Sequence, residues 1–381
     1  MTQTILHLLP NSAPCGARVQ AELLADRARA AGAEVTLYAL PQRFADSPLA
    51  LRTAGRLTLC QLAKKLRPSL VHIWGEHALA EGLAAVRSVG ARAIVTLRHC
   101  DPWKAPDARH LAMAHHVVVN QPGLKRAFAE RGCDTQNWVV IPDGVEPFPP
   151  QGEMPKCDAH LLSTPLRTRT SQYEPTQSEP LQSAPTRAEL LARYGLPENA
   201  RLVFCVGPVR PWKRWKWAIW SIDSIVRLYP DVRLVFIGDG NREDLLAPQR
   251  ALLERFAHQY QRAEIVHFLG NLPHEEVRRL LPLGTLFWSP QSVPGSGLAM
   301  LEAMAAGVPV VTTATPEIDW LALPEICEHV PVMGETIGIA AASHRFLSQP
   351  ERTAQMAQAA QQWVRERFSV ESTWAEYAKL V

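Results

Sequence analysis

A turn of small residues before an apolar helix is the part of the sequence best suited to bind an anion. Gly295, Ser296 and Gly297 follow an expected strand, and a helix is expected to begin near Leu298. Backbone N–H groups at a helix start are unpaired, and the helix dipole favours negative charge there. We therefore expect this turn to hold a diphosphate.

Glu302 is the one charged residue of that apolar helix. Glu302 lies four residues after Leu298 and seven after Gly295, so it lies on the same helix face as the turn. Helical side chains tilt toward the amino end of the helix, which directs the Glu302 side chain toward the turn. A carboxylate in a buried helix is costly unless it has a partner or a function. Glu302 could accept hydrogen bonds from ligand hydroxyls. The plainer alternative is a Glu at the one solvated position of a packed helix.

The elements that position these residues follow a regular alternation of short apolar strands and amphipathic helices. This alternation predicts βαβ units and parallel sheets. It restarts after residue 186, which indicates two doubly wound, Rossmann-like α/β domains. Ligands of such sheets lie at the carboxyl ends of the strands, so the site is expected in a cleft between the domains. The expected strands are 5–9, 35–39, 70–74, 93–97, 116–119, 138–141, 202–206, 233–237, 265–268, 286–288 and 308–311.

Residues 147–186 separate the two halves. Eight of these 40 residues are Pro, and the stretch contains no Val, Ile or Trp. It cannot bury enough apolar surface to offset the entropy lost on ordering, so we predict a disordered insertion and linker. An ordered surface loop is the alternative.

Composition excludes several classes of protein. The chain has 381 residues and a net charge of +3, which is too balanced for a protein defined by nucleic-acid binding. It has no apolar run long enough for a spanning helix, and its first ten residues do not resemble a signal peptide. Seven cysteines without a Cys-x-x-Cys motif indicate a reducing compartment and no structural zinc. We expect a cytoplasmic protein.

The positive charge belongs to the first domain. Residues 1–146 hold 17 basic and 12 acidic residues, a net of +5. We expect a peripheral contact with an anionic membrane surface there. The residues expected to make it are Arg52, Arg56, Lys64, Lys65 and Arg67, around a helix at 57–66.

The segment around Glu302 resembles the donor site of the retaining GT-B glycosyltransferases of the family-four type. That family has Glu-Gly-Phe-Gly-Leu, two residues, then Leu-Glu-Ala-Met-Ala. Here Pro294-Gly-Ser-Gly-Leu298 and Leu301-Glu-Ala-Met-Ala305 stand in those places. Segments 141–146, 234–240, 266–270 and 365–369 are also similar to the family, so the resemblance covers nearly the whole chain except 147–186.

The resemblance implies a role for each domain. Residues 1–146 would bind the acceptor, with a C-terminal helix at 370–381 packing back on them, and residues 187–369 would bind a nucleotide sugar. Gly295, Ser296, Gly297 and Leu298 would offer amides to the diphosphate, and Glu302 would hold the ribose hydroxyls.

Lys213, Gly16 and His99 complete the site that the resemblance implies. Lys213, six residues after Gly207, stands where the family keeps a phosphate-binding Lys; an exposed Lys near a helix start is the alternative. In the first domain, the loop at 12–17, whose one glycine is Gly16, resembles the family's Gly-rich loop. His99 matches the His placed against the transferring sugar, although a His at a strand end is often structural.

Two positions depart from the family. Pro294 stands where the family has an acidic residue, and Pro208 where it has an Arg. Arg210 could replace that Arg from the same loop. These departures leave open a protein that binds a nucleotide sugar or a glycan without transferring it. A dinucleotide-dependent oxidoreductase is disfavoured because no Gly-x-Gly-x-x-Gly follows the first strand.

The leading interpretation is a metal-independent retaining glycosyltransferase. It would transfer a sugar from a nucleoside diphosphate sugar to a hydroxyl of a glycan, a lipid or a small molecule. The sequence has no Asp-x-Asp metal motif. We expect no bound metal and no cofactor beyond the nucleotide sugar, which is a co-substrate.

Overall fold

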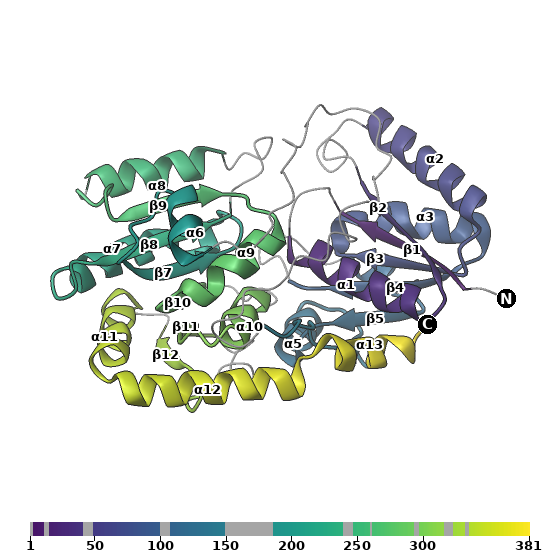
Figure 1. Cartoon of the computed structure of the whole chain (residues 1–381). Helices are drawn as coiled ribbons and strands as arrows, with labels where there is room; N and C mark the ends of the chain where they lie inside the picture. Colours follow the sequence, from purple (N-terminus) through teal and green to yellow (C-terminus); the bar gives the residue numbers. More distant parts are fainter. Residues whose placement is uncertain are drawn as a thin grey trace.

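The computed structural model describes residues 3–10, 15–40, 49–99, 107–148, 186–238, 247–259, 261–292, 297–315, 323–331 and 335–381. They form two lobes side by side, each built on a six-stranded sheet with flanking helices (Figure 1). The strand pairs within both sheets are parallel. This confirms the two doubly wound α/β units expected from the sequence.

The first sheet has the order β2-β1-β3-β4-β5-β6. Its central strands are almost wholly buried, as expected when helices cover both faces of a parallel sheet. Its strands are β1 (Thr4–Leu9), β2 (Glu34–Ala39), β3 (Leu70–Trp74), β4 (Arg92–Leu97), β5 (His116–Val119) and β6 (Val139–Val140). The helices between them are α1 (Gly16–Ala30), α2 (Leu49–Leu66), α3 (Leu79–Val89), α4 (Ala108–Leu111) and α5 (Pro122–Glu130).

The second sheet has the order β12-β11-β10-β7-β8-β9. Its strands are β7 (Arg201–Val206), β8 (Val232–Ile237), β9 (Val266–Gly270), β10 (Leu286–Ser289), β11 (Val310–Ala314) and β12 (Glu328–Pro331). Its helices are α6 (Arg187–Arg193), α7 (Trp215–Val226), α8 (Ala247–Gln259), α9 (His274–Leu280), α10 (Leu298–Ala305), α11 (Glu335–Ser348) and α12 (Pro350–Arg367).

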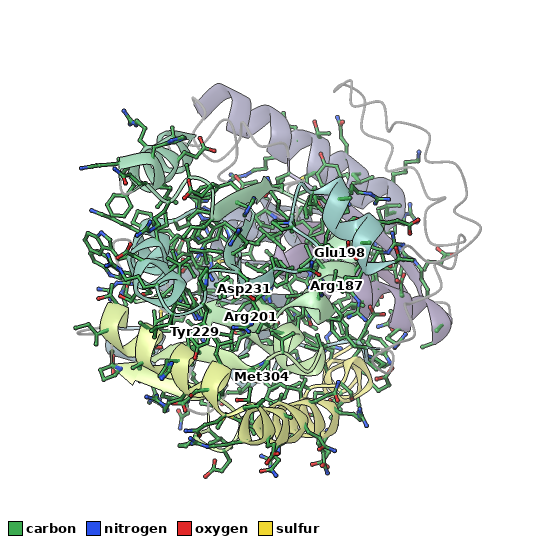
Figure 2. All side chains as sticks on the ribbon, turned by 60° about the vertical axis from the view of Figure 1, so that its left-hand side comes forward. Arg187, Glu198, Arg201, Tyr229, Asp231 and Met304 are labelled. Carbon is green, nitrogen blue, oxygen red and sulfur yellow. The ribbon has the colours of Figure 1, made fainter. Side chains whose placement is uncertain are left out.

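Charged side chains at the amino edge of the second sheet pair with one another. Arg201, at the start of β7, lies 3.2 Å from Asp231, which directly precedes β8. Its guanidinium also lies 5.2 Å from the ring centroid of Tyr229 (Figure 2). Because β7 and β8 are parallel, this cluster lies at the end of the sheet opposite to the one where ligands of such folds bind.

The end of the chain returns to the first lobe. Helix α12 runs beneath the second lobe, and α13 (Val370–Ala378) lies under the first sheet (Figure 1). Val145 and Ser369 form a parallel bridge where the two chain segments meet. Arg27 on α1 pairs with Glu371 at 2.6 Å.

A buried polar chain ties α13 to the core of the first sheet. The Tyr377 hydroxyl lies 2.9 Å from the Thr96 hydroxyl, which lies 2.7 Å from His72 Nε2. Beside them, Trp74 Nε1 donates to His7 Nδ1 at 3.1 Å. Burial lowers the pKa of His7 to about 3 and that of His72 well below its usual value, so both rings are neutral.

The ends of the predicted insertion make defined contacts. Arg278 donates to the carbonyl oxygen of Pro147 at 2.9 Å, and its guanidinium lies 4.3 Å from the Phe148 ring centroid. Thr186 and Glu189 form a capping box that begins α6. Residues 149–185 lie outside the described residues.

Candidate active site

Two glycines bring the loops after β7 and β8 into close approach. Gly207 has a φ of 139° and Gly238 a φ of 122°, both in the region that favours glycine. A Cβ atom on Gly238 would collide with the carbonyl oxygen of Gly207. One on Gly207 would lie 3.2 Å from Cε of Lys213, so the glycine leaves space for the lysine to fold over the turn.

Lys213 is a partly buried cation that faces a neutral partner. Its Nζ donates to Oε1 of Gln291 at 3.1 Å, and Gln291 is buried in the loop after β10. Burial lowers the pKa of Lys213 to about 8. Among the described residues no carboxylate pairs with this ammonium, so an anion placed against it would stabilise its charged form.

The loops after β7 and β10 are joined at a second point. The backbone N–H of Ser292 donates to the carbonyl oxygen of Trp212 at 2.8 Å. Because β7 and β10 pair in parallel, both loops leave the same edge of the sheet. Lys213 is the last residue of a 3-10 turn at Pro211–Lys213, and α7 begins only at Trp215.

Helix α10 begins at Leu298, as predicted, after Gly297 in the left-handed conformation. Gly295 and Ser296 lie outside the described residues, as does Pro294. Glu302 is only 5% exposed, so the alternative of a solvated surface Glu is wrong. Its Oε1 lies 2.6 Å from Nε2 of His274, the first residue of α9.

The first lobe contributes a buried charged cluster at the carboxyl edge of its sheet. Arg98 directly follows β4, and its Nε donates to Asp143 Oδ1 at 3.1 Å while Nη2 pairs with Oδ2. Asn120 donates to the same carboxylate at 3.1 Å. Gly16 is the first residue of α1 rather than part of the loop before it, and a Cβ there would lie 2.6 Å from Arg98 Nη1.

His99 and Arg210 are two further predicted site residues. His99 is exposed, one position beyond the buried Arg98. The Arg210 guanidinium lies 5.8 Å from the ring centroid of Trp212. Arg210 also lines a cavity of about 280 Å³ between α7 and α8, together with Trp217 and Phe256.

Three side chains of the candidate site were not predicted from the sequence: Arg98, His274 and Gln291. Each lies in a segment that leaves the carboxyl edge of a strand, the edge at which parallel sheets bind ligands. Their positions just after strand ends could therefore have identified these residues as candidates. The tertiary contacts that single out these three residues were not visible in the sequence.

Comparison with known families matches both halves of the chain. The family described as Glycosyl transferases group 1 matches residues 186–363, and the one described as Glycosyltransferase Family 4 matches residues 14–147. The chain belongs to the group 1 glycosyltransferases. The first match contains Lys213, Gln291, His274 and Glu302, and the second contains Gly16 and Arg98.

Sequence relatives of this glycosyltransferase include two bacterial enzymes. It is 26% identical over 194 residues to the N-acetyl-alpha-D-glucosaminyl L-malate synthase of Bacillus anthracis, a match that covers 50% of this chain and 47% of the relative. It is 28% identical over 202 residues to the GDP-mannose-dependent alpha-(1-6)-phosphatidylinositol monomannoside mannosyltransferase of Mycolicibacterium smegmatis, covering 51% of each. The chain thus spans about half the length of these relatives.

The overall fold is that of GT-B proteins. The crystal structure of HepE from Anabaena in complex with UDP-glucose superposes with a TM-score of 0.73 at 18% identity, covering 99% of this chain and 98% of that one. At this identity the likeness shows the fold alone. It confirms the predicted arrangement of two Rossmann-like units in a GT-B architecture.

Proposed function

We propose that this group 1 glycosyltransferase transfers a sugar from a nucleoside diphosphate sugar to an acceptor hydroxyl, with retention of configuration and without a metal ion. The observation that carries the proposal is the environment of Lys213. A partly buried ammonium whose described partner is a neutral amide loses hydration without gaining an opposite charge. A diphosphate placed against it would supply the missing negative charge.

Each candidate site residue has a proposed role in this reaction. Lys213 would bind the diphosphate and stabilise the charge that develops as it leaves, a task that other folds give to Mg²⁺. The amide end of α10 at Leu298 would bind the same group. Glu302 would hold the ribose hydroxyls. The cluster around Arg98 and Gly16 belongs to the first lobe, where the acceptor would bind.

The proposed reaction conserves atoms and charge. The bond between the anomeric carbon and the diphosphate oxygen breaks on one face of the sugar, and the acceptor oxygen bonds to that carbon on the same face. The acceptor proton moves to the departing phosphate oxygen. Lys213, as a fixed cation, lowers the energy of this transition state without taking part in proton transfer.

The relatives support a nucleotide sugar as the donor. The structure of HepE from Anabaena was determined in complex with UDP-glucose, and the Mycolicibacterium relative is named a GDP-mannose-dependent mannosyltransferase. We propose screening UDP- and GDP-linked sugars and measuring release of the nucleoside diphosphate. Turnover of one of them supports the transferase. The absence of both binding and turnover with all of them would contradict it.

A peripheral membrane contact through α2 is part of the proposal. No helix in the described part of the chain is long and apolar enough to cross a membrane. Arg56, Lys64, Lys65 and Arg67 are exposed on or just after α2, and Leu57 of the same helix is 60% exposed. A helix that exposes both basic and apolar side chains suits an anionic lipid surface. The side chain of Arg52 lies outside the described residues.

A protein that binds a nucleotide sugar without transferring it remains the second candidate. Pro208, which stands where the family has an Arg, favours it: this residue is exposed in the loop that carries Lys213 and offers no charge to a leaving phosphate. The same screen separates the two functions, because a binding protein would retain a nucleotide sugar and release no product.

A further inference from the structure

The His274–Glu302 contact joins two helices that begin at the carboxyl edge of the second sheet. His274 opens α9 after the loop that leaves β9, and Glu302 lies in α10 after the loop that leaves β10. Nε2 and Oε1 are 2.6 Å apart. The Glu302 side chain is 7% exposed and that of His274 is 28% exposed.

The imidazole of His274 stabilises the buried carboxylate of Glu302. The other residues of α10 are apolar, and a buried carboxylate without donors would be strongly unfavourable. Within the described part of the chain, His274 is the one side chain that donates to Glu302. A carboxylate accepts hydrogen bonds, so Nε2 of His274 carries the proton and donates the hydrogen bond to Oε1.

The second oxygen of Glu302, Oε2, accepts no hydrogen bond from the described residues. A buried carboxylate that is held through one oxygen and leaves the other unused has a fixed orientation and a remaining acceptor. That is the arrangement required to bind a ligand hydroxyl at a defined place.

We infer that His274 is a positioning residue, which orients Glu302 through Oε1 so that Oε2 alone receives the ribose hydroxyls of the donor. This inference rests on the proposed function, because it takes the ligand to be a nucleoside diphosphate sugar. Without His274 the carboxylate would be free to rotate. Recognition of the ribose would then weaken, while the grip of Lys213 on the diphosphate would persist.

The test compares ligands that differ only in the ribose. Binding of UDP, of GDP and of their 2′,3′-dideoxy counterparts is measured by calorimetry for the wild type, His274→Ala, His274→Gln and Glu302→Gln. Glu275→Ala, on the same turn of α9 but paired with Arg279, is the matched control. Thermal melts establish that each variant is folded.

The expected pattern is selective. For the diphosphate that the wild type binds, His274→Ala weakens binding about tenfold, the scale of one hydrogen bond to a charged group, and changes binding of the dideoxy ligand less than about twofold. His274→Gln restores most of the loss, since its amide N–H can replace Nε2–H. With the full donor, KM rises and kcat changes little, because ground-state binding is affected.

Three results would overturn the inference, and they are distinguishable from one another. An equal loss for ribose and dideoxy ligands in His274→Ala shows a general structural role. No loss for either ligand in His274→Ala shows that Glu302 needs no support from His274. If Glu302→Gln nevertheless loses the preference for the ribose ligand, the proposed function stands without this inference. A wild type that binds none of the diphosphates removes both proposals.

Discussion

The Nζ of Lys213 and the Oε1 of Gln291 lie 3.1 Å apart and join the loops that follow two neighbouring strands of the second sheet. The amide oxygen accepts one hydrogen bond from the ammonium but does not neutralise its positive charge. The lysine is thereby held at the carboxyl edge of the sheet in a state that favours either an anionic ligand or loss of a proton.

The affinity for a nucleoside diphosphate should fall as the pH rises through about 8. The pKa of Lys213 in the empty protein is about 8, and a bound diphosphate would raise it, so binding above pH 8 takes up a proton. We expect affinity to decrease by up to about tenfold per pH unit there. Calorimetry between pH 7 and 9.5 measures this, and Lys213→Gln should show weaker binding without the same slope.

Removing the charge of Lys213 should stabilise the empty protein. The folded pKa of about 8 lies below the usual 10.5, so the unfolded chain binds more protons between these values. The free energy of unfolding therefore rises with pH from about 8 to 10.5 in the wild type. Lys213→Met should flatten this rise and add about 2–3 kcal/mol at pH 7 in urea unfolding. A destabilised variant would show that the ammonium is well solvated.

Arg98→Met should destabilise the first lobe by about 3 kcal/mol, because it leaves Asp143 buried without its cation. The further change Asp143→Asn should recover part of the loss, since the charge that lacked a partner is gone. Urea unfolding of both variants measures the coupling. If the two losses simply add, the pair does not act as a unit.

Tyr377→Phe should lower the free energy of unfolding by about 1 kcal/mol, the usual value of a hydrogen bond to a neutral partner. The lost bond is the one between α13 and Thr96, while His72 still reaches the Thr96 hydroxyl. Thermal or urea unfolding of the full chain measures it. Tyr229→Phe, whose hydroxyl contacts His344 in an exposed position, is a matched control expected to change stability less.

Charge reversal at Lys64 and Lys65 should reduce binding to anionic vesicles at low salt. Both lie exposed in the last turn of α2, and each basic residue near such a surface contributes about 1 kcal/mol. Trp217→Ala should leave binding unchanged, because Trp217 stacks on Trp220 at the edge of the second lobe. A wild type that fails to sediment with vesicles even at low ionic strength contradicts the membrane contact.

Much of the fold could be predicted because buried parallel strands are short apolar runs. The strands at 70–74 and 116–119 were predicted with the bounds that the structure has. Strand β12 was missed because Glu-His-Val-Pro at 328–331 buries only Val330 and so lacks an apolar run. Helix α2 begins at Leu49, eight residues before its predicted start at residue 57.

The candidate site was predictable only in part. Glu302 and Lys213 stand out as charges in motifs, and both are placed at the carboxyl edge of the second sheet. Their partners His274 and Gln291 are 28 and 78 positions away, so only the fold brings them together. In the first lobe, His99 matches a family position just after a strand end, whereas the buried residue at that strand end is its neighbour Arg98.

The most direct test of the account is the release of nucleoside diphosphate from nucleotide sugars by the wild type and Lys213→Gln, in parallel. We expect the wild type to turn over one UDP- or GDP-linked sugar. Lys213→Gln should remain folded and lose about 100-fold or more in kcat, the effect of removing a group that stabilises the leaving charge. Equal turnover by the two proteins, or binding of the donor without any turnover by the wild type, would contradict the account.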